Sequence, residues 1–378
     1  MAPAPTLPDI DELCALGRAE GLDAVGVCTA APFDETRNAL EERRAAGLSA
    51  GMAFTFRQPD RSTDPTRALR RASSLVVGAL AYRRAEPTRP DAGAPIARVA
   101  AYAWEDHYAA LRAGLHAIGR ELRAHGWRTR ICVDDNALVD RPAALRAGLG
   151  WAGKSGNVLL PGRGSWFVLG AVVTDAPLVD EDPPVVADGC GSCRRCLDGC
   201  PTRAIVAPGV VDARRCLSWL LQAPGVFPRE YRVALGDRLY GCDECQEVCP
   251  PNRRDDRGGH VAAAPGAQAR VDLLELLAST DDEILARHGR WYIWKRDPRW
   301  VRRNALVVLG NIGAGDDPAV AAALARALAD PDPMLRAHAV WAADRLGRQD
   351  LLGPVASDPD EHVRAELAAC HVAGPQRR

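Results

Sequence analysis

The most informative stretch of this 378-residue sequence is Cys190-Gly191-Ser192-Cys193-Arg194-Arg195-Cys196-Leu197-Asp198-Gly199-Cys200-Pro201. Its spacing, CxxCxxCxxxCP, is the spacing with which bacterial ferredoxins bind 4Fe–4S clusters. In such a run the first three cysteines bind one cluster, and the fourth cysteine binds another. The stretch therefore predicts two clusters and a second group of cysteines elsewhere in the chain.

That second group is Cys242-x2-Cys245-x3-Cys249-Pro250, and Cys216 is the nearest cysteine that can complete it. Following the crossover rule, we predict one cluster on Cys190, Cys193, Cys196 and Cys249, and the other on Cys200, Cys216, Cys242 and Cys245. Zinc is the alternative ion, but zinc ribbons use separated CxxC pairs. The other four cysteines stand among apolar residues and are expected to fill the core: Cys14, Cys28, Cys132 and Cys370.

The composition is that of an ordinary globular protein, with 47% hydrophobic and 26% charged residues. A net charge of −1 excludes a globally basic nucleic-acid coat but leaves room for a local basic patch. No stretch approaches the ~20 apolar residues of a membrane helix. The N-terminus has no basic or apolar segment typical of a secretory signal, so we expect a cytoplasmic protein with reduced cysteines.

Hydrophobic patterning predicts three segments. Residues 1–178 are expected to form an α/β domain, residues 179–259 the double-cluster domain, and residues 260–378 a helical repeat domain. In the first segment we expect helices at 9–20, 34–46 and 108–125, and strands at 24–28, 75–82, 130–133 and 168–173. The runs 75–82 and 168–173 are almost wholly apolar, which is typical of strands covered on both faces. Residues 253–269 have no periodicity and are expected to be a linker.

The C-terminal segment repeats a short phrase of Asp-Pro, a gap, an aliphatic-Arg pair and an alanine-rich helix. The pairs are Val301-Arg302, Leu335-Arg336 and Val363-Arg364, at offsets of 34 and 28 residues. This spacing resembles short HEAT-like repeats, in which stacked helix pairs bury a shared core. A plain helical bundle is the alternative.

Residues 133–157 contain the densest set of candidate catalytic and binding groups. Asp134 follows a predicted strand, where an aspartate is either a turn former or, if desolvated, a proton donor. The segment 146–157 has four glycines and Lys154, one of only two lysines. It could cradle a cofactor or simply pack. It also matches the Walker A spacing, but a P-loop follows a strand and opens a helix, and neither is expected here.

Taken together, these motifs closely resemble the epoxyqueuosine reductase family, cobalamin-dependent enzymes of the last step of queuosine synthesis on tRNA. The resemblance rests on Val133-Asp134, on 146–154, on Gly164-Ser165-Trp166, on both cysteine groups, and on Arg303-Asn304 with Gly310-Asn311. It covers nearly the whole chain. It implies two 4Fe–4S clusters that pass electrons to base-off cobalamin, which opens the epoxide of the wobble nucleoside.

The resemblance also implies roles for individual residues. Asp134 matches the family's proton donor, and the expected cobalamin contacts are Arg57, Asp134, Gly153, Lys154, Ser155 and Asn157. The basic, aromatic-rich stretch 287–303 suits a tRNA partner, with the expected contacts Arg290, Lys295, Arg296, Arg299, Arg302 and Arg303. The alternative for this stretch is an arginine-rich repeat surface with tryptophans packed between helices. An external donor such as a flavodoxin or ferredoxin would supply electrons, and we expect a monomer.

Two other functions stay open at this stage. The family usually has other residues at Asp135, Ala137, Ser155-Gly156, 220–223 and Pro251. A related corrinoid reductase with another substrate, comparable to reductive dehalogenases, is therefore one alternative. The other is a non-catalytic two-cluster electron carrier that docks through its repeats, although a carrier needs little beyond the cysteine segment.

Overall fold

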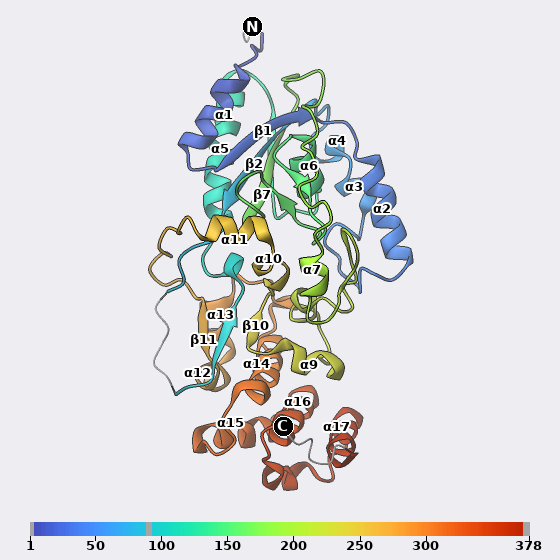
Figure 1. The fold of residues 1–378 in the computed structure, drawn as a ribbon, viewed down its shortest axis with the longest axis vertical. Helices are drawn as coiled ribbons and strands as arrows, with labels where there is room; N and C mark the ends of the chain where they lie inside the picture. Colours follow the sequence, from blue (N-terminus) through green and yellow to red (C-terminus); the bar gives the residue numbers. More distant parts are fainter. Residues whose placement is uncertain (1–3, 88–92, 373–378) are drawn as a thin grey trace. The chain divides into compact units, whose positions relative to one another are not determined.

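The computed structural model describes residues 4–87 and 93–372, which form two compact units (Figure 1). Unit 1 contains residues 1–85, 105–214 and 243–263, and unit 2 contains residues 86–104, 215–242 and 264–378. Both units are therefore assembled from segments that are distant in the sequence. In the described part of the chain, no helix is long and apolar enough to cross a membrane.

Unit 1 is built on a four-stranded antiparallel sheet in the order β1-β2-β7-β4. Its strands are β1 (Ala24–Thr29), β2 (Ser74–Ala81), β7 (Phe167–Thr174) and β4 (Thr129–Val133). Every residue of β2 except Ala81 is buried, and so is every residue of β7 except Phe167. Both faces of the sheet are therefore covered, which explains why these central strands lack the polar alternation of a half-exposed antiparallel sheet.

Helix α5 (His107–Ala124) covers one face of the sheet. Gly78 of β2 lies opposite Gly170 of β7, and a Cβ at either glycine would lie about 3 Å from the Leu115 side chain. The two glycines thus leave the space that Leu115 fills. Helix α1 (Ile10–Ala19) packs against α5, and the Asp9 carboxylate caps it by accepting from the Glu12 N–H at 3.0 Å.

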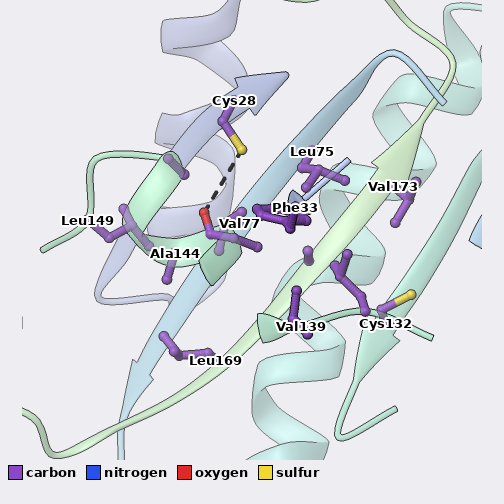
Figure 2. Close-up of a cluster of buried hydrophobic side chains, with 14 of the residues drawn as sticks. Cys28, Phe33, Leu75, Val77, Cys132, Val139, Ala144, Leu149, Leu169 and Val173 are labelled. Carbon is purple, nitrogen blue, oxygen red and sulfur yellow. Dashed lines mark hydrogen bonds between the residues drawn. The ribbon is translucent and has the colours of Figure 1, made fainter. Parts of the chain in front are cut away.

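Helix α6 (Asp140–Arg146) packs on the same sheet through a different set of side chains, which form the core shown in Figure 2. Val77 and Ala171 of the strands meet Ala143 and Ala144 of the helix in this cluster. Cys28 also lies here, and burial raises the pKa of its thiol to about 12. Cys14, Cys28, Cys132 and Cys370 are all buried, as their apolar neighbours predicted.

The remaining elements of unit 1 are short. Near the sheet are helices α2 (Asp34–Ala45), α3 (Pro59–Ser62) and α4 (Pro65–Ala68), and the hairpin of β5 (Trp151–Ala152) and β6 (Val158–Leu159). The cysteine-rich segments contain α7 (Arg195–Asp198), β8 (Ile205–Ala207), β9 (Val210–Val211), α10 (Glu244–Glu247) and α11 (Pro250–Asp256). Helix α11 begins at Pro250, a residue that favours a helix start. It extends to Asp256 and therefore includes the first residues of the linker predicted at 253–269.

Unit 2 combines a small sheet with a run of helices. The sheet has the order β10-β3-β11, from β3 (Ile96–Val99), β10 (Arg238–Tyr240) and β11 (Arg270–Asp272). The shorter helices are η1 (Ala101–Ala103), α8 (Leu217–Leu220), α9 (Arg229–Leu235), α12 (Leu273–Ala278), α13 (Asp281–His288) and η2 (Trp294–Arg296). The repeats are α14 (Arg299–Ile312), α15 (Pro318–Leu328), α16 (Pro333–Arg345), η3 (Gln349–Val355) and α17 (Glu361–Val372).

The repeated Asp-Pro phrase marks starts of repeat helices. Asp332 caps α16 by accepting from the Met334 N–H at 2.9 Å, and Pro333 occupies the first helical position. Asp358 holds Arg336 of the preceding repeat through two hydrogen bonds of 2.7 and 2.9 Å. The phrase therefore caps a helix and joins neighbouring repeats.

Replacement of Leu115 by alanine tests the packing of α5 on the sheet. Leu115 is fully buried over the glycine pair, so Leu115→Ala should lower the free energy of unfolding by about 2–5 kcal/mol. Urea unfolding of the purified protein measures this loss. The control Leu7→Ala changes a leucine that is 55% exposed, and equal losses in both variants would contradict the packing described.

Candidate functional site

Asp134 lies directly after β4, at the edge of the sheet. Its φ of 50° places it in the left-handed region, which is uncommon for residues other than glycine but is tolerated by aspartate. The side chain is exposed at an open cavity of about 520 Å³. The cavity is lined by residues of α5 and β4 and of the turn after β4: Arg112, His116, Arg123, Thr129, Ile131, Val133, Asp134 and Asp135.

The neighbouring carboxylate, Asp135, is occupied by structural contacts. It pairs with Arg130 at 3.2 Å, and its other oxygen accepts from the Ala137 N–H at 2.9 Å. The Asn136 carboxamide oxygen accepts from the Thr55 N–H at 2.9 Å, which ties the turn to the segment that carries Arg57. Both aspartates line the cavity, but both oxygens of Asp135 are engaged as acceptors in the turn, which leaves Asp134 as the carboxylate open to a ligand.

The surroundings of Asp134 favour its protonated form. Desolvation by the surrounding protein raises the pKa of this carboxyl, and the negative charges of Asp140 and Asp135 raise it further, against an opposing effect of Arg112. A carboxyl that keeps its proton at higher pH while reaching a cavity can donate that proton to a ligand.

The glycine-rich segment forms a hairpin, so the Walker A alternative is wrong: Lys154 and Ser155 stand between β5 and β6 and open no helix. Gly153 is buried, and a Cβ there would lie 2.1 Å from the Leu159 side chain. Its N–H donates to the Asn157 carbonyl at 2.8 Å. Gly153 therefore closes the hairpin, while Ser155 and Asn157 are half-buried at its tip.

The Lys154 ammonium contacts the first cysteine loop. Its Nζ donates to the Gly191 carbonyl and, at 3.1 Å, to the Cys193 carbonyl. The hairpin is held in place by Arg141, which donates to the Gly156 carbonyl, and by the Gly209 N–H, which donates to the Lys154 carbonyl, both at 3.0 Å.

The four cysteines predicted for the first cluster lie in unit 1 and act on one another electrostatically. Burial, together with the smaller effects of Cys190, Cys196 and Cys193, raises the pKa of Cys249 to about 11, against an opposing hydrogen bond from the Asn252 backbone. Burial also raises the pKa of Cys196, again with contributions from Cys190 and Cys193. None of the four is in a disulfide. Four free thiols gathered from two segments, three from the first run and one from the second, suit the predicted cluster.

The other four cysteines are divided between the units. In unit 1, Cys200 Sγ accepts from the Ala204 N–H at 3.2 Å, a contact that would stabilise a thiolate, and Cys245 lies in α10. Cys216 and Cys242 lie in unit 2. In the described residues, no three His, Cys, Asp or Glu side chains are placed to hold a single metal ion. In a 4Fe–4S cluster the thiolates bind different irons, so they need not converge on one point.

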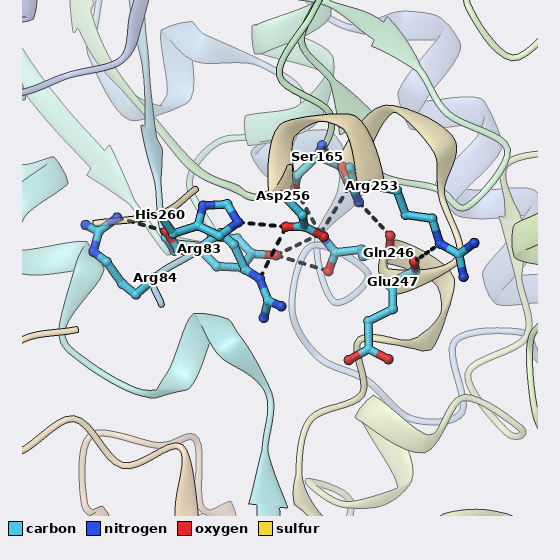
Figure 3. A network of polar contacts seen from close by, with 10 residues as sticks. Arg83, Arg84, Ser165, Gln246, Glu247, Arg253, Asp256 and His260 are labelled. Carbon is cyan, nitrogen blue, oxygen red and sulfur yellow. Dashed lines mark hydrogen bonds and ion pairs between the residues drawn. The ribbon is translucent and has the colours of Figure 1, made fainter. Parts of the chain in front are cut away.

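A buried polar network joins the second cysteine group to the start of β7 (Figure 3). The Asn252 carboxamide accepts from the Ser165 N–H at 2.6 Å and donates to the Ser165 hydroxyl at 3.0 Å and to the Gln246 carbonyl at 2.8 Å. Gln246 in turn donates to the Ser165 carbonyl at 3.0 Å and to the Tyr82 hydroxyl at 2.8 Å. Gln246 stands inside the second cysteine motif, whereas the only sequence signal for Asn252 is its proximity to Cys249.

In unit 2, two residues of α14 hold the segments that precede Cys242 and follow Cys216. The Arg303 guanidinium donates to the Ala223 and Gly225 carbonyls at 2.7 Å and to the Leu220 carbonyl at 2.9 Å. Asn304 donates to the Leu221 carbonyl at 2.8 Å and to the Leu239 carbonyl at 3.3 Å. Arg303 is only 1% exposed, so the prediction that it contacts RNA is wrong.

The rest of the basic stretch 287–303 is mostly at the surface. Lys295 and Arg296 are exposed, and both have left-handed backbones, with φ of 52° and 54°. Arg290 and Arg299 are exposed but bonded, Arg290 to the Trp104 carbonyl and Arg299 to Asp297 and Asp332. Arg302 is half-buried and paired with Asp281. Trp291 is buried between the rings of Tyr240 and His288, whereas the Tyr292 ring is 49% exposed.

Comparison with known proteins gives consistent matches. A model of the 4Fe–4S double cluster binding domain matches residues 189–252, which include all eight predicted ligands, and HEAT repeats match residues 291–370. The bundle alternative is therefore wrong. An epoxyqueuosine reductase of Bacillus subtilis (strain 168) is 32% identical over 372 residues, 94% of each chain.

Solved structures agree with this match. A crystal structure of epoxyqueuosine reductase with an epoxyqueuosine-modified tRNA-Tyr stem loop is 31% identical and has a TM-score of 0.85, covering 95% of this chain and 97% of that one. A Bacillus subtilis structure with its catalytic aspartate loop swung out of the active site is 30% identical, with a TM-score of 0.84 and the same coverage.

Loss of the Asn252 carboxamide should loosen the second cysteine group. Asn252→Ala leaves the buried Ser165 N–H without a partner and removes one of the two donors to the Gln246 carbonyl, so we expect a loss of about 1–3 kcal/mol in the free energy of unfolding. Urea unfolding under anaerobic conditions measures it. Asn38→Ala, at an exposed asparagine of α2, is the control and should be within about 0.5 kcal/mol of the parent.

Proposed function

This chain belongs to the epoxyqueuosine reductase family of oxidoreductases, and we propose that it reduces epoxyqueuosine to queuosine at the wobble position of tRNA. The observation that carries the proposal is the pair of features within unit 1: a cavity-facing acid, Asp134, and a set of four thiols for a cluster. A reductase needs both an electron source and a proton donor. A relative solved with a modified tRNA stem loop supports the choice of substrate.

The reduction removes an epoxide oxygen as water and leaves an alkene, so it consumes two electrons and two protons. Cleavage of the first C–O bond develops negative charge on oxygen, which a nearby acid must neutralise. We assign that step to Asp134, because its surroundings raise the pKa of the carboxyl, which favours the protonated form, and its side chain reaches the cavity. Asp135 keeps the turn in shape through Arg130 and the Ala137 N–H.

Two 4Fe–4S clusters are the electron path of this proposal, on the two sets of four cysteines predicted above. The chemistry of the first set fits, since four free thiols from two segments act on one another within unit 1. Cobalamin is the proposed reaction centre, and it supplies a cobalt nucleophile that no side chain can match. Arg57, Asp134, Ser155 and Asn157 would hold it. All four present exposed or half-buried groups, whereas Gly153 serves the hairpin.

The proposed tRNA surface lies in the basic stretch of unit 2. Lys295 presents a charge for phosphates, and the exposed Tyr292 ring offers a face on which a base can stack. Arg290, Arg296, Arg299 and Arg302 would be secondary contacts, because each is already bonded to protein. We propose that segments 1–178, 179–259 and 260–378 carry catalysis, electron transfer and RNA docking in a cytoplasmic monomer fed by a flavodoxin or ferredoxin.

A direct assay tests this function. Cluster-reconstituted protein with cobalamin and a chemical reductant is incubated anaerobically with a tRNA stem loop that carries epoxyqueuosine, and the nucleosides are analysed by mass spectrometry. Formation of queuosine supports the proposal. Cobalamin binding without conversion would indicate a related reductase with another substrate, and failure to bind cobalamin would indicate an electron carrier.

Replacement of the proposed acid should separate chemistry from binding. Asp134→Asn should lower single-turnover rates by about 10²–10⁴-fold, because the amide cannot supply the proton. Stem-loop affinity and iron content should be unchanged. Asp60→Asn, at an exposed aspartate of α3, is the matched control. A turnover rate for Asp134→Asn close to that of the parent would assign the proton to water or another residue.

The rate should also depend on pH with a definite sign. The active form of Asp134 is the protonated one, so the single-turnover rate should fall as pH rises through the raised pKa of this carboxyl. The fall should occur at a higher pH than for an ordinary carboxyl. Rates measured at saturating stem loop across a pH series give the profile. A rate that rises over the same range would contradict the assignment of Asp134 as an acid.

Iron analysis tests the ligand sets. Cys249→Ser should remove one cluster and leave about half of the parent's iron, because each cluster needs four thiolates. Cys28→Ser changes a buried core thiol and should retain the full iron content. Full iron in Cys249→Ser would show that Cys249 is not a ligand.

A further inference from the structure

The one lysine of the glycine-rich hairpin bonds to the loop of the first cysteine group. Lys154 Nζ donates to the carbonyls of Gly191 and Cys193, and Cys190 and Cys193 are two of the predicted ligands of the first cluster. The same loop is closed by the Cys193 N–H, which donates to the Cys190 carbonyl at 2.9 Å, and by Asp188, which accepts from the Cys190 N–H at 2.8 Å. Lys154 is thus a direct partner of the ligand loop.

The charge of this ammonium is not neutralised by a carboxylate. Across residues 4–87 and 93–372, no Asp or Glu oxygen lies within ion-pair distance of Lys154, whose partners are both carbonyls. Nearby, four thiolates would carry four negative charges once they bind iron. The reduction potential of an iron–sulfur cluster is set by net charge, hydrogen bonding and solvent exposure, so an unpaired cation at the ligand loop favours the reduced, more negative cluster.

The backbone around Lys154 is held from two sides, so the ammonium has a defined place. The Gly209 N–H donates to the Lys154 carbonyl at 3.0 Å, and Arg141 donates to the Gly156 carbonyl two residues later at 3.0 Å. A lysine on a mobile loop would spread its charge over many positions. A lysine on an anchored hairpin applies its charge at one point of the ligand loop.

We propose that Lys154 is a positioning residue of the first cluster, which holds the Cys190–Cys193 loop and raises the reduction potential of the cluster bound there. This assigns Lys154 to the cluster, in place of the cobalamin contact that the family resemblance implied. The proposal rests on the cluster ligands Cys190, Cys193, Cys196 and Cys249, and it does not depend on the substrate.

The test is an anaerobic redox titration of reconstituted protein, followed by EPR of the reduced clusters. Lys154→Gln keeps a donor but removes the charge, and Lys154→Arg keeps both. We expect Lys154→Gln to shift the oxidised-to-reduced ratio of the first cluster about tenfold toward oxidised at a fixed potential, which is 59 mV for a one-electron couple. Lys154→Arg should stay close to the parent, and the second cluster should not shift.

Arg120→Gln is the control, because it removes one positive charge from the exposed side of α5 in the same unit without touching the hairpin or the cysteine loop. An equal shift in Arg120→Gln would overturn the proposal, since it would show a general effect of charge. An unchanged reduction potential in Lys154→Gln would overturn the proposal as well. If that variant also fails to bind cobalamin, Lys154 is a cobalamin contact instead.

Iron content covers the case in which Lys154→Gln does not assemble the first cluster. Restoration of the full iron content by Lys154→Arg would then support the proposal, because charge and donors together are what the loop requires. Loss of the same cluster in Lys154→Arg would overturn it and leave Lys154 as a packing residue. Iron analysis of the parent protein tests the cluster assignment itself, and the epoxyqueuosine assay tests the substrate, so the three failures are distinguishable.

Discussion

The carboxamide of Asn252 connects two parts of unit 1 that are 87 residues apart in the sequence. It holds the N–H and hydroxyl of Ser165, just before β7, and the carbonyl of Gln246, in α10 between Cys245 and Cys249. These groups are buried, so each unmet hydrogen bond would cost about 1–3 kcal/mol. The position of Cys249 relative to the sheet therefore depends on this network, and through Cys249 so does the predicted set of four thiols for the first cluster.

The polar groups of unit 1 have structural or chemical roles according to the charged partners that each one has. Asp135 is neutralised by Arg130 and serves the turn, whereas Asp134 faces a cavity in surroundings that raise its pKa. Lys154 has only carbonyl partners and lies at the loop of Cys190 and Cys193. A carboxyl with a raised pKa and a cation beside the predicted cluster ligands both suit a reaction that takes up protons together with electrons. Both arise from residues within one unit.

The repeat helices have a structural role beside any contact with RNA. Arg303 and Asn304 of α14 bind the carbonyls that follow Cys216 and one that precedes Cys242. The place of Arg303 in a basic stretch suggested a contact with phosphate. The side chain is instead buried and binds backbone carbonyls. The motif Arg303-Asn304 with Gly310-Asn311 is explained in part by the same geometry, since Asn311 donates to the Arg232 and Gly236 carbonyls at 2.7 and 3.0 Å.

Local patterns alone determined a large part of this protein. The cysteine spacing predicted a double-cluster domain, the offsets of the aliphatic-Arg pairs predicted HEAT repeats, and apolar runs placed β2, β7 and α5. Each of these is a property of neighbouring residues, because backbone geometry sets the periods of helices and strands. Even the position of Asp134 after a strand could be predicted in this way.

Only the tertiary structure decided which charged or polar side chain meets which partner. Two adjacent aspartates have the same local sequence signal and line the same cavity, yet Arg130 and the Ala137 N–H engage Asp135 and leave Asp134 open to a ligand. Lys154 meets a loop almost forty residues away, and Arg303 meets carbonyls about eighty residues away. These outcomes depend on desolvation and on long-range contacts, which are set by the packing of whole elements and leave no periodic trace in the sequence.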